Sequence, residues 1–240
     1  VWIDSFEQPF TMDGIDIVWL IDKSGSMNQH SNAVVAGIEQ MINALPPSGW
    51  RLGVATTDFG ETQTASHFPL VPGDTAADAE AILNSITFSY REAGFDALYG
   101  YLEDNTYNQT WLRDDAALLV VFVSDEEEQS YQHFTNNNQG VADFVQWYSN
   151  QRPSAFLASI VNLPGPQSVC DGTVNPINYG DRYIYATNAL NGVIVDICST
   201  DWSPGVADAT NQIEPHEEWP LSHTPLEDTL IVFEDSVEKP

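Results

Sequence analysis

The chain has 240 residues, 42% of them apolar, which suits one α/β domain with an appendage or two small domains. Only 7 basic residues stand against 35 acidic ones, and the formal net charge is −28 at pH 7. This charge argues against nucleic acid or an anionic membrane surface as a partner and favours cationic or metallic partners. We expect no membrane insertion, because the apolar runs are far shorter than the ~20 residues that a spanning helix needs.

Strands and helices are predicted to alternate along most of the chain. Residues 15–21 (IDIVWLI) and 118–123 (LLVVFV) are nearly continuous apolar runs, which are typical of strands buried on both faces of a parallel sheet. Apolar residues at helical spacing predict helices over residues 31–45, 76–86, 95–103 and 141–148. Further strands are expected at residues 51–57, 156–161 and 193–197, with an edge strand at 67–71.

This alternation predicts βαβ units with right-handed crossovers. We therefore expect an α/β fold, with a doubly wound, mostly parallel, Rossmann-like sheet in three layers, over residues 1–213. Residues 214–240 differ, because prolines interrupt them and their one strand-like stretch is 229–234 (TLIVFE). We expect this segment to be a C-terminal extension or the start of a β-rich segment.

Two aspartates follow the two most apolar predicted strands, Asp22 after residues 15–21 and Asp125 after residues 118–123 and Ser124. In a doubly wound sheet of order 3-2-1-4-5-6, the first and fourth strands are neighbours, and a crevice forms at their carboxyl ends. Ser24 and Ser26 add hydroxyl oxygens from the adjoining loop. Carboxylates and hydroxyls select hard cations, so the sequence predicts a site for Mg²⁺, with Mn²⁺ or Ca²⁺ as substitutes.

At these residues the chain resembles the von Willebrand factor A (vWA) domains. Residues 22–26 (DKSGS) match the Asp-x-Ser-x-Ser loop of the family's metal-ion-dependent adhesion site (MIDAS). Residues 122–130 (FVSDEEEQS) are similar to the family's fourth strand and metal-site aspartate, and residues 182–198 (RYIYATNALNGVIVDIC) to its last helix and strand. The resemblance covers roughly residues 14 to 200 and is nearest to a secreted bacterial and phage-encoded branch.

The resemblance implies roles for the four residues. Ser24 and Ser26 would bind the metal directly, and Asp22 and Asp125 would act mainly through water. An open coordination position would take a carboxylate from a protein partner.

One position departs from the family, because its second-loop threonine falls near Gly94. Glu92, Asp96 or water could take the place of that side chain. A carboxylate there would favour Ca²⁺ and weaken the capture of an acidic partner group. Of the acidic run 125–128, only Asp125 is given a role, and Glu126, Glu127 and Glu128 are predicted to form a solvated loop.

Cys170 and Cys198 are the only cysteines. They form no Cys-x-x-Cys pair and have no histidines at zinc-finger spacing beside them, which favours a disulfide over a metal site. Two buried free thiols are the alternative. A disulfide would place the protein in an extracellular, cell-surface, periplasmic or virion setting.

No catalytic residues are predicted, because the chain lacks a Gly-x-Ser-x-Gly motif and none of its histidines is tied by spacing to a carboxylate. The expected function is that of a metal-dependent binding or adhesion module that recognises a protein or glycan partner. The alternative is a structural scaffold in a virion or cell-surface assembly, with a vestigial or purely stabilising metal site.

Overall fold

The computed structural model describes residues 14–170, 178–213, 222, 231–234 and 237–239. Contacts divide the chain into two units, one formed by Met12–Glu214 and the other by Val1–Thr11 with Pro215–Pro240. In the second unit, β6 (Val232–Glu234) pairs antiparallel with β7 (Val237–Lys239). The strand-like stretch predicted at residues 229–234 therefore contains β6.

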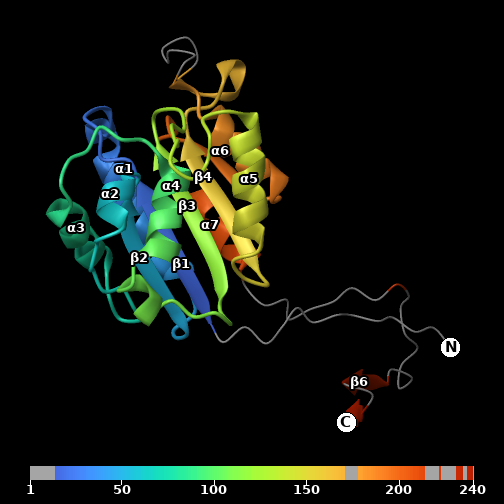
Figure 1. The fold of residues 1–240 in the computed structure, drawn as a ribbon. Coiled ribbons are helices and arrows are strands. Elements are labelled where there is room, and N and C mark those ends of the chain that lie inside the picture. Colours follow the sequence, from blue (N-terminus) through green and yellow to red (C-terminus); the bar gives the residue numbers. More distant parts are fainter. Residues whose placement is uncertain (1–13, 171–177, 214–221, 223–230, 235–236, 240) are drawn as a thin grey trace. The chain divides into compact units, whose positions relative to one another are not determined.

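Five parallel strands form the sheet of the first unit, in the order β2-β1-β3-β4-β5 (Figure 1). They are β1 (Ile15–Ile21), β2 (Trp50–Thr56), β3 (Ala117–Ser124), β4 (Ala155–Val161) and β5 (Val193–Asp196). Every residue of β1 and β3 is buried, as their continuous apolar runs predict. Ile21 is paired with Val123, so β1 and β3 are neighbours that end at the same level.

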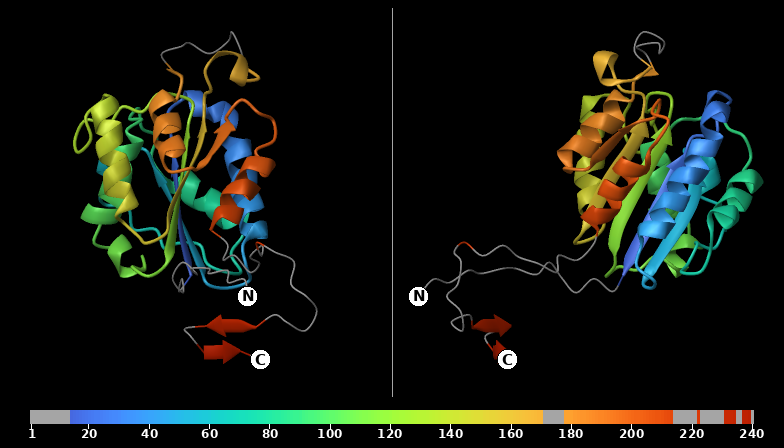
Figure 2. Two further views of the ribbon diagram at one scale, coloured as in Figure 1. Left: turned by 90° about the vertical axis from the view of Figure 1, so that its right-hand side faces the viewer. Right: turned by 180° about the vertical axis from the view of Figure 1, so that it is seen from behind.

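Helices cover both faces of this sheet (Figures 1 and 2). One face carries α1 (Ser31–Ala44), α3 (Ala76–Ser85) and α7 (Ser203–Gln212), and the other carries α4 (Gly94–Tyr99), α5 (Asn138–Ser149) and α6 (Asp181–Ala189). Successive side chains of β1 point to opposite faces: Trp19 packs in the first core, and Val18 and Leu20 in the second. The three-layer α/β fold expected from the sequence is confirmed.

Shorter turns complete the unit. The α-helical turn α2 (Phe59–Thr62) and the π-helical turn η2 (Gly100–Asp104) lie beside α4. The 3-10 turns among the described residues are η1 (Ser26–His30), η3 (Asn108–Thr110) and η4 (Gly165–Gln167). The helix predicted at 95–103 is thus divided into α4 and η2. The predicted edge strand at 67–71 is reduced to one antiparallel bridge between Leu70 and Leu52.

Within the described ranges, no helix is long and apolar enough to cross a membrane.

Candidate metal centre

Asp22 joins the loop after β1 to the end of β3. Its Oδ1 accepts a hydrogen bond of 2.7 Å from the backbone N–H of Ser24, and its Oδ2 accepts one of 2.9 Å from the hydroxyl of Ser124. The backbone N–H of Asp22 also donates to the carbonyl of Val123 over 2.9 Å. Asp22 is therefore held in one orientation, with only 1% of its surface exposed.

A chain of oxygen atoms extends from this loop to Asp125. The Oγ atoms of Ser24 and Ser26 lie 2.8 Å apart, and the hydroxyl of Ser26 donates to Asp125 Oδ1 over 2.9 Å. Asp22, Ser24, Ser26 and Asp125 thus lie together at the carboxyl ends of β1 and β3, the place where a doubly wound sheet forms its crevice. The structure brings together the four residues that the sequence predicts, and their binding of a metal stays a prediction.

The crevice accumulates acidic groups. Burial, with a smaller contribution from the nearby Asp125 carboxylate, raises the pKa of Asp22 to about 6. Burial, followed by the negative charges of Asp22, Glu126 and Asp125, raises the pKa of Glu92 to about 8. A bound cation would lower both pKa values, because it stabilises the ionised carboxylates.

Basic side chains do not neutralise this charge. In the part of the chain that the structure describes, the ion pairs are Arg113–Asp16, Arg152–Asp114 and Arg182–Glu127, and none includes Asp22, Glu92 or Asp125. The described part of the chain contains no group of three or more His, Cys, Asp or Glu side chains placed to hold a metal. A metal in the crevice would therefore depend on the serine hydroxyls as well as on the carboxylates.

The family model of the von Willebrand factor type A domain matches residues 16–159. The chain belongs to this family. The match includes both strands that form the crevice and all four residues that converge in it.

A solved structure supports the vWA fold. Proximal thread matrix protein 1 (PTMP1) from the mussel byssus, in a structure with a zinc-occupied MIDAS motif, is 13% identical with a TM-score of 0.53. The match covers 83% of this chain and 45% of the length of the mussel protein. Two further PTMP1 structures, each 11% identical, have TM-scores of 0.46 and 0.43. At this identity the likeness shows the fold alone, and a comparison with curated proteins gives no match.

Gly94, the position nearest the family's second-loop threonine, has no room for a side chain. A Cβ atom on Gly94 would lie 2.5 Å from Tyr183 Oη and 3.1 Å from Phe122 Cδ1. Tyr183 is fully buried, and its hydroxyl lies beside the backbone N–H of Gly94. In this vWA domain, the hydroxyl of Tyr183 takes the space that a side chain at position 94 would fill.

The structure separates the two carboxylates that could replace the threonine. Asp96 is fully buried, and its two oxygens accept four backbone N–H groups over 2.7–3.2 Å. The donors are Tyr131, Gln132, His133 and Phe134. Because these bonds occupy the Asp96 carboxylate, it holds the segment 131–134, and we do not include it in the proposed metal site.

Glu92 differs from Asp96 because it is coupled to the crevice. Its side chain is 6% exposed and accepts a hydrogen bond of 2.7 Å from Gln129 Nε2, which leaves its other oxygen free of side-chain donors in the described residues. The negative charges of Asp22 and Asp125 contribute to its raised pKa. Its role as an additional ligand stays a prediction, because Glu92, Asp22 and Asp125 do not form a group of three acidic side chains placed to hold a metal among the described residues.

Glu128 contradicts the prediction of a solvated acidic loop. It is 1% exposed, and its Oε1 accepts backbone N–H groups from Phe95 over 3.2 Å and Ser130 over 3.0 Å, together with the Ser130 hydroxyl. Burial raises the pKa of Glu128 to about 7. The prediction failed because the first backbone N–H groups of α4, which lack helical partners, lie next to this loop.

The structure contains the disulfide between Cys170 and Cys198, with their Cα atoms 5.7 Å apart. Cys198 Sγ lies 3.6 Å from Asn162 Oδ1, and the amide of Asn162 donates to the backbone carbonyl of Asp125. The disulfide is thus linked to the crevice through Asn162, which sequence reasoning missed. The signal for it was its place directly after β4, at the same edge of the sheet as Asp22 and Asp125.

Proposed function

We propose that this vWA domain holds one divalent cation on Asp22, Ser24, Ser26 and Asp125 and binds a protein partner through it. The observation that carries the proposal is the oxygen chain from Ser24 through Ser26 to Asp125. A serine hydroxyl that gives its hydrogen to a carboxylate keeps its lone pairs for a cation. The serines would therefore bind the ion directly, and the two aspartates would act mainly through water.

Mg²⁺ is the proposed ion, with Ca²⁺ or Mn²⁺ as substitutes, because the oxygen set contains neither thiolate nor imidazole. Glu92 as a third carboxylate would raise the negative charge of the site and shift its preference towards Ca²⁺. The zinc-occupied MIDAS motif of the mussel protein supports a divalent site in this fold.

The proposed role is binding or adhesion rather than catalysis. The disulfide supports an extracellular, cell-surface or virion setting, because such bonds persist outside reducing compartments. The open coordination position would take a carboxylate of the partner. The resemblance of residues 122–130 to a secreted bacterial and phage-encoded branch supports the same setting.

Metal titration of the chelator-treated protein tests the proposal. Mg²⁺, Mn²⁺ and Ca²⁺ are titrated by calorimetry into the whole chain and into Asp22→Ala and Ser26→Ala variants, at a salt concentration that screens the surface charge. The control is Glu39→Gln, which removes one exposed negative charge from α1. We expect one saturable site that both site variants lose and the control keeps. Weak, multiple binding shared by all four proteins would contradict the proposal.

The second candidate function is a structural scaffold, which the likeness to a thread matrix protein favours. The Asp22→Ala variant separates the two functions. Loss of partner binding with an intact fold would support adhesion, whereas unchanged assembly would support the scaffold.

A further inference from the structure

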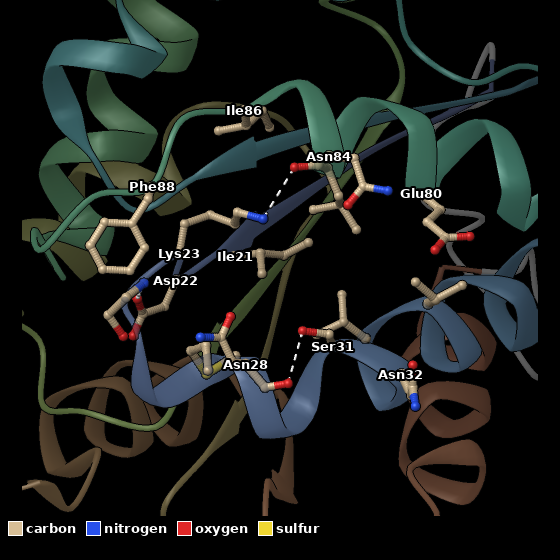
Figure 3. Close-up of a pocket in the computed structure, with 15 residues that line it drawn as sticks. Ile21, Asp22, Lys23, Asn28, Ser31, Asn32, Glu80, Asn84, Ile86 and Phe88 are labelled. Atoms are coloured by element: carbon tan, nitrogen blue, oxygen red, sulfur yellow. Dashed lines mark hydrogen bonds between the residues drawn. The ribbon is translucent and has the colours of Figure 1, made fainter.

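A cavity of about 260 Å³ lies between α1 and α3, beside the loop of residues 22–26 (Figure 3). Its apolar wall consists of buried side chains of β1, η1, α1, α3 and the segment after α3, namely Ile21, Met27, Val34, Leu83 and Ile86. Asp22 and Ser24, two of the proposed metal ligands, also line it. A partner group on the metal would therefore be next to this cavity.

The mouth of the cavity is polar and offers hydrogen-bond acceptors. The exposed carboxylate of Glu80 lines it, with the side-chain amides of Asn32 and Asn84 (Figure 3). Lys23 is the one basic residue of the lining, and its ammonium group donates to the carbonyl of Leu83 over 3.1 Å. That carbonyl belongs to the last turn of α3, so Lys23 already has a structural role.

This combination of an apolar wall and an acidic mouth fits a long basic side chain. Lysine and arginine place their aliphatic stems on apolar surface and keep their charged heads in a polar environment. An acidic side chain in the cavity would be repelled by Glu80, in a protein of net charge −28. An uncharged apolar side chain would contact the wall but would gain no attraction to the exposed Glu80 carboxylate.

We propose that the cavity between α1 and α3 binds a lysine or arginine side chain of the partner protein. That one partner contacts both the metal and the cavity rests on the proposed function. The binding of a basic side chain in the cavity does not need the metal. The partner would then present a basic residue near the acidic residue that the metal holds.

Nuclear magnetic resonance titration of the isotope-labelled whole chain tests this proposal. The probe is Nα-acetyl-lysine N-methylamide, and its control is the norleucine analogue, which has the stem without the ammonium group. We expect the lysine probe to shift amide signals of α1 and α3 in a saturable manner. The Glu80→Gln variant should bind it up to about fivefold more weakly, which is the upper limit for the loss of one exposed ion pair.

Matched variants distinguish this contact from general charge attraction. Glu39→Gln removes an exposed charge of α1 that lies outside the cavity lining, so it should leave the affinity for the lysine probe unchanged. Equal affinity for the two probes, equal weakening by Glu39→Gln and Glu80→Gln, or shifts confined to residues that do not line the cavity would overturn the proposal.

Ser26→Ala separates the cavity from the metal site, because Ser26 does not line the cavity. The titration is repeated with this variant and with chelator, and lysine binding should persist in both. If metal binding fails while lysine binding persists, the proposed function is wrong and the cavity stands. If lysine binding fails while the metal titration succeeds, only the cavity proposal is wrong.

Discussion

A side chain at position 94 would have to displace the hydroxyl of Tyr183, which lies 2.5 Å from where its Cβ would stand. We expect Gly94→Ala to lower the free energy of unfolding by about 1–3 kcal/mol, which is typical of overpacking. Tyr183→Phe makes room at position 94 but leaves the backbone N–H of Gly94 without the hydroxyl, so we expect it to change the free energy of unfolding by no more than about 1 kcal/mol. Because both substitutions act on the contact between position 94 and the Tyr183 hydroxyl, the double variant should be more stable than the sum of the two single effects predicts.

Urea denaturation of the wild type, the two single variants and the double variant measures this coupling. Strictly additive effects would mean that the Tyr183 hydroxyl does not limit the space at Gly94.

Glu128 makes the stability depend on pH. Its pKa is about 7 in the folded state and near 4.5 in the unfolded state, so the folded state binds more protons between these values. The contribution of the protonated Glu128 to stability is complete below pH 4.5 and is lost as the pH rises to about 7. This loss lowers the free energy of unfolding by about 3 kcal/mol. Glu128→Gln cannot ionise, so we expect it to remove this part of the pH dependence.

Denaturation midpoints between pH 5 and pH 8 check this expectation. Glu103→Gln, at an exposed position, controls for the general effect of removing one negative charge. Equal slopes for Glu128→Gln and the wild type would show that Glu128 is ionised in the folded protein.

At the scale of elements, α4 is held to the segment 131–134 by Asp96. Four backbone N–H groups donate to this one buried carboxylate, and Asp96→Ala would leave them without it. We expect a loss of about 2–4 kcal/mol in the free energy of unfolding, and a smaller loss for Asp96→Asn, which keeps one acceptor oxygen. Asp115→Ala, at an exposed position, is the control in guanidinium denaturation. A loss no larger than in this control would mean that the segment is held by other contacts.

The elements that the sequence predicts best are those whose burial follows from a local pattern of apolar residues. β1 and β3 are buried on both faces and therefore appear as continuous apolar runs, which also placed Asp22 and Asp125 in one crevice. By contrast, α7 was missed because Val206 and Ala209 are the only apolar side chains that it buries. The bridge at Leu70 looked like a strand because a single pairing leaves the same short apolar signal.

The site shows the same division. The arrangement of the loop of residues 22–26 could be predicted because its aspartate and its two serines are close together in the sequence. The roles of Asp96, Glu128, Asn162 and Tyr183 could not, because each depends on a segment distant in the sequence or on a turn of the backbone. No local pattern distinguishes a buried glutamate that accepts helix N–H groups from a solvated one.

At the scale of the whole molecule, the disulfide joins residues 28 positions apart. Its removal should lower the free energy of unfolding by about 3.5 kcal/mol, because it restricts the unfolded chain. For a domain of this size, that loss corresponds to a fall of about 7–14 °C in Tm. Calorimetry of the wild type with and without a dithiol reductant measures this fall, and the Cys170→Ser/Cys198→Ser double variant should be insensitive to the reductant.

Asp196 also restrains the residues next to the two cysteines, through hydrogen bonds instead of a covalent bond. Its carboxylate accepts hydrogen bonds from the hydroxyl of Ser168 and from the backbone N–H groups of Val169 and Cys198, over 2.8–3.1 Å. These bonds persist in principle without the disulfide. A wild-type Tm that the reductant leaves unchanged, with the reduced thiols verified by alkylation, would therefore show that noncovalent contacts such as those of Asp196 are sufficient. A fall in Tm that the double variant reproduces would assign the restraint to the covalent bond.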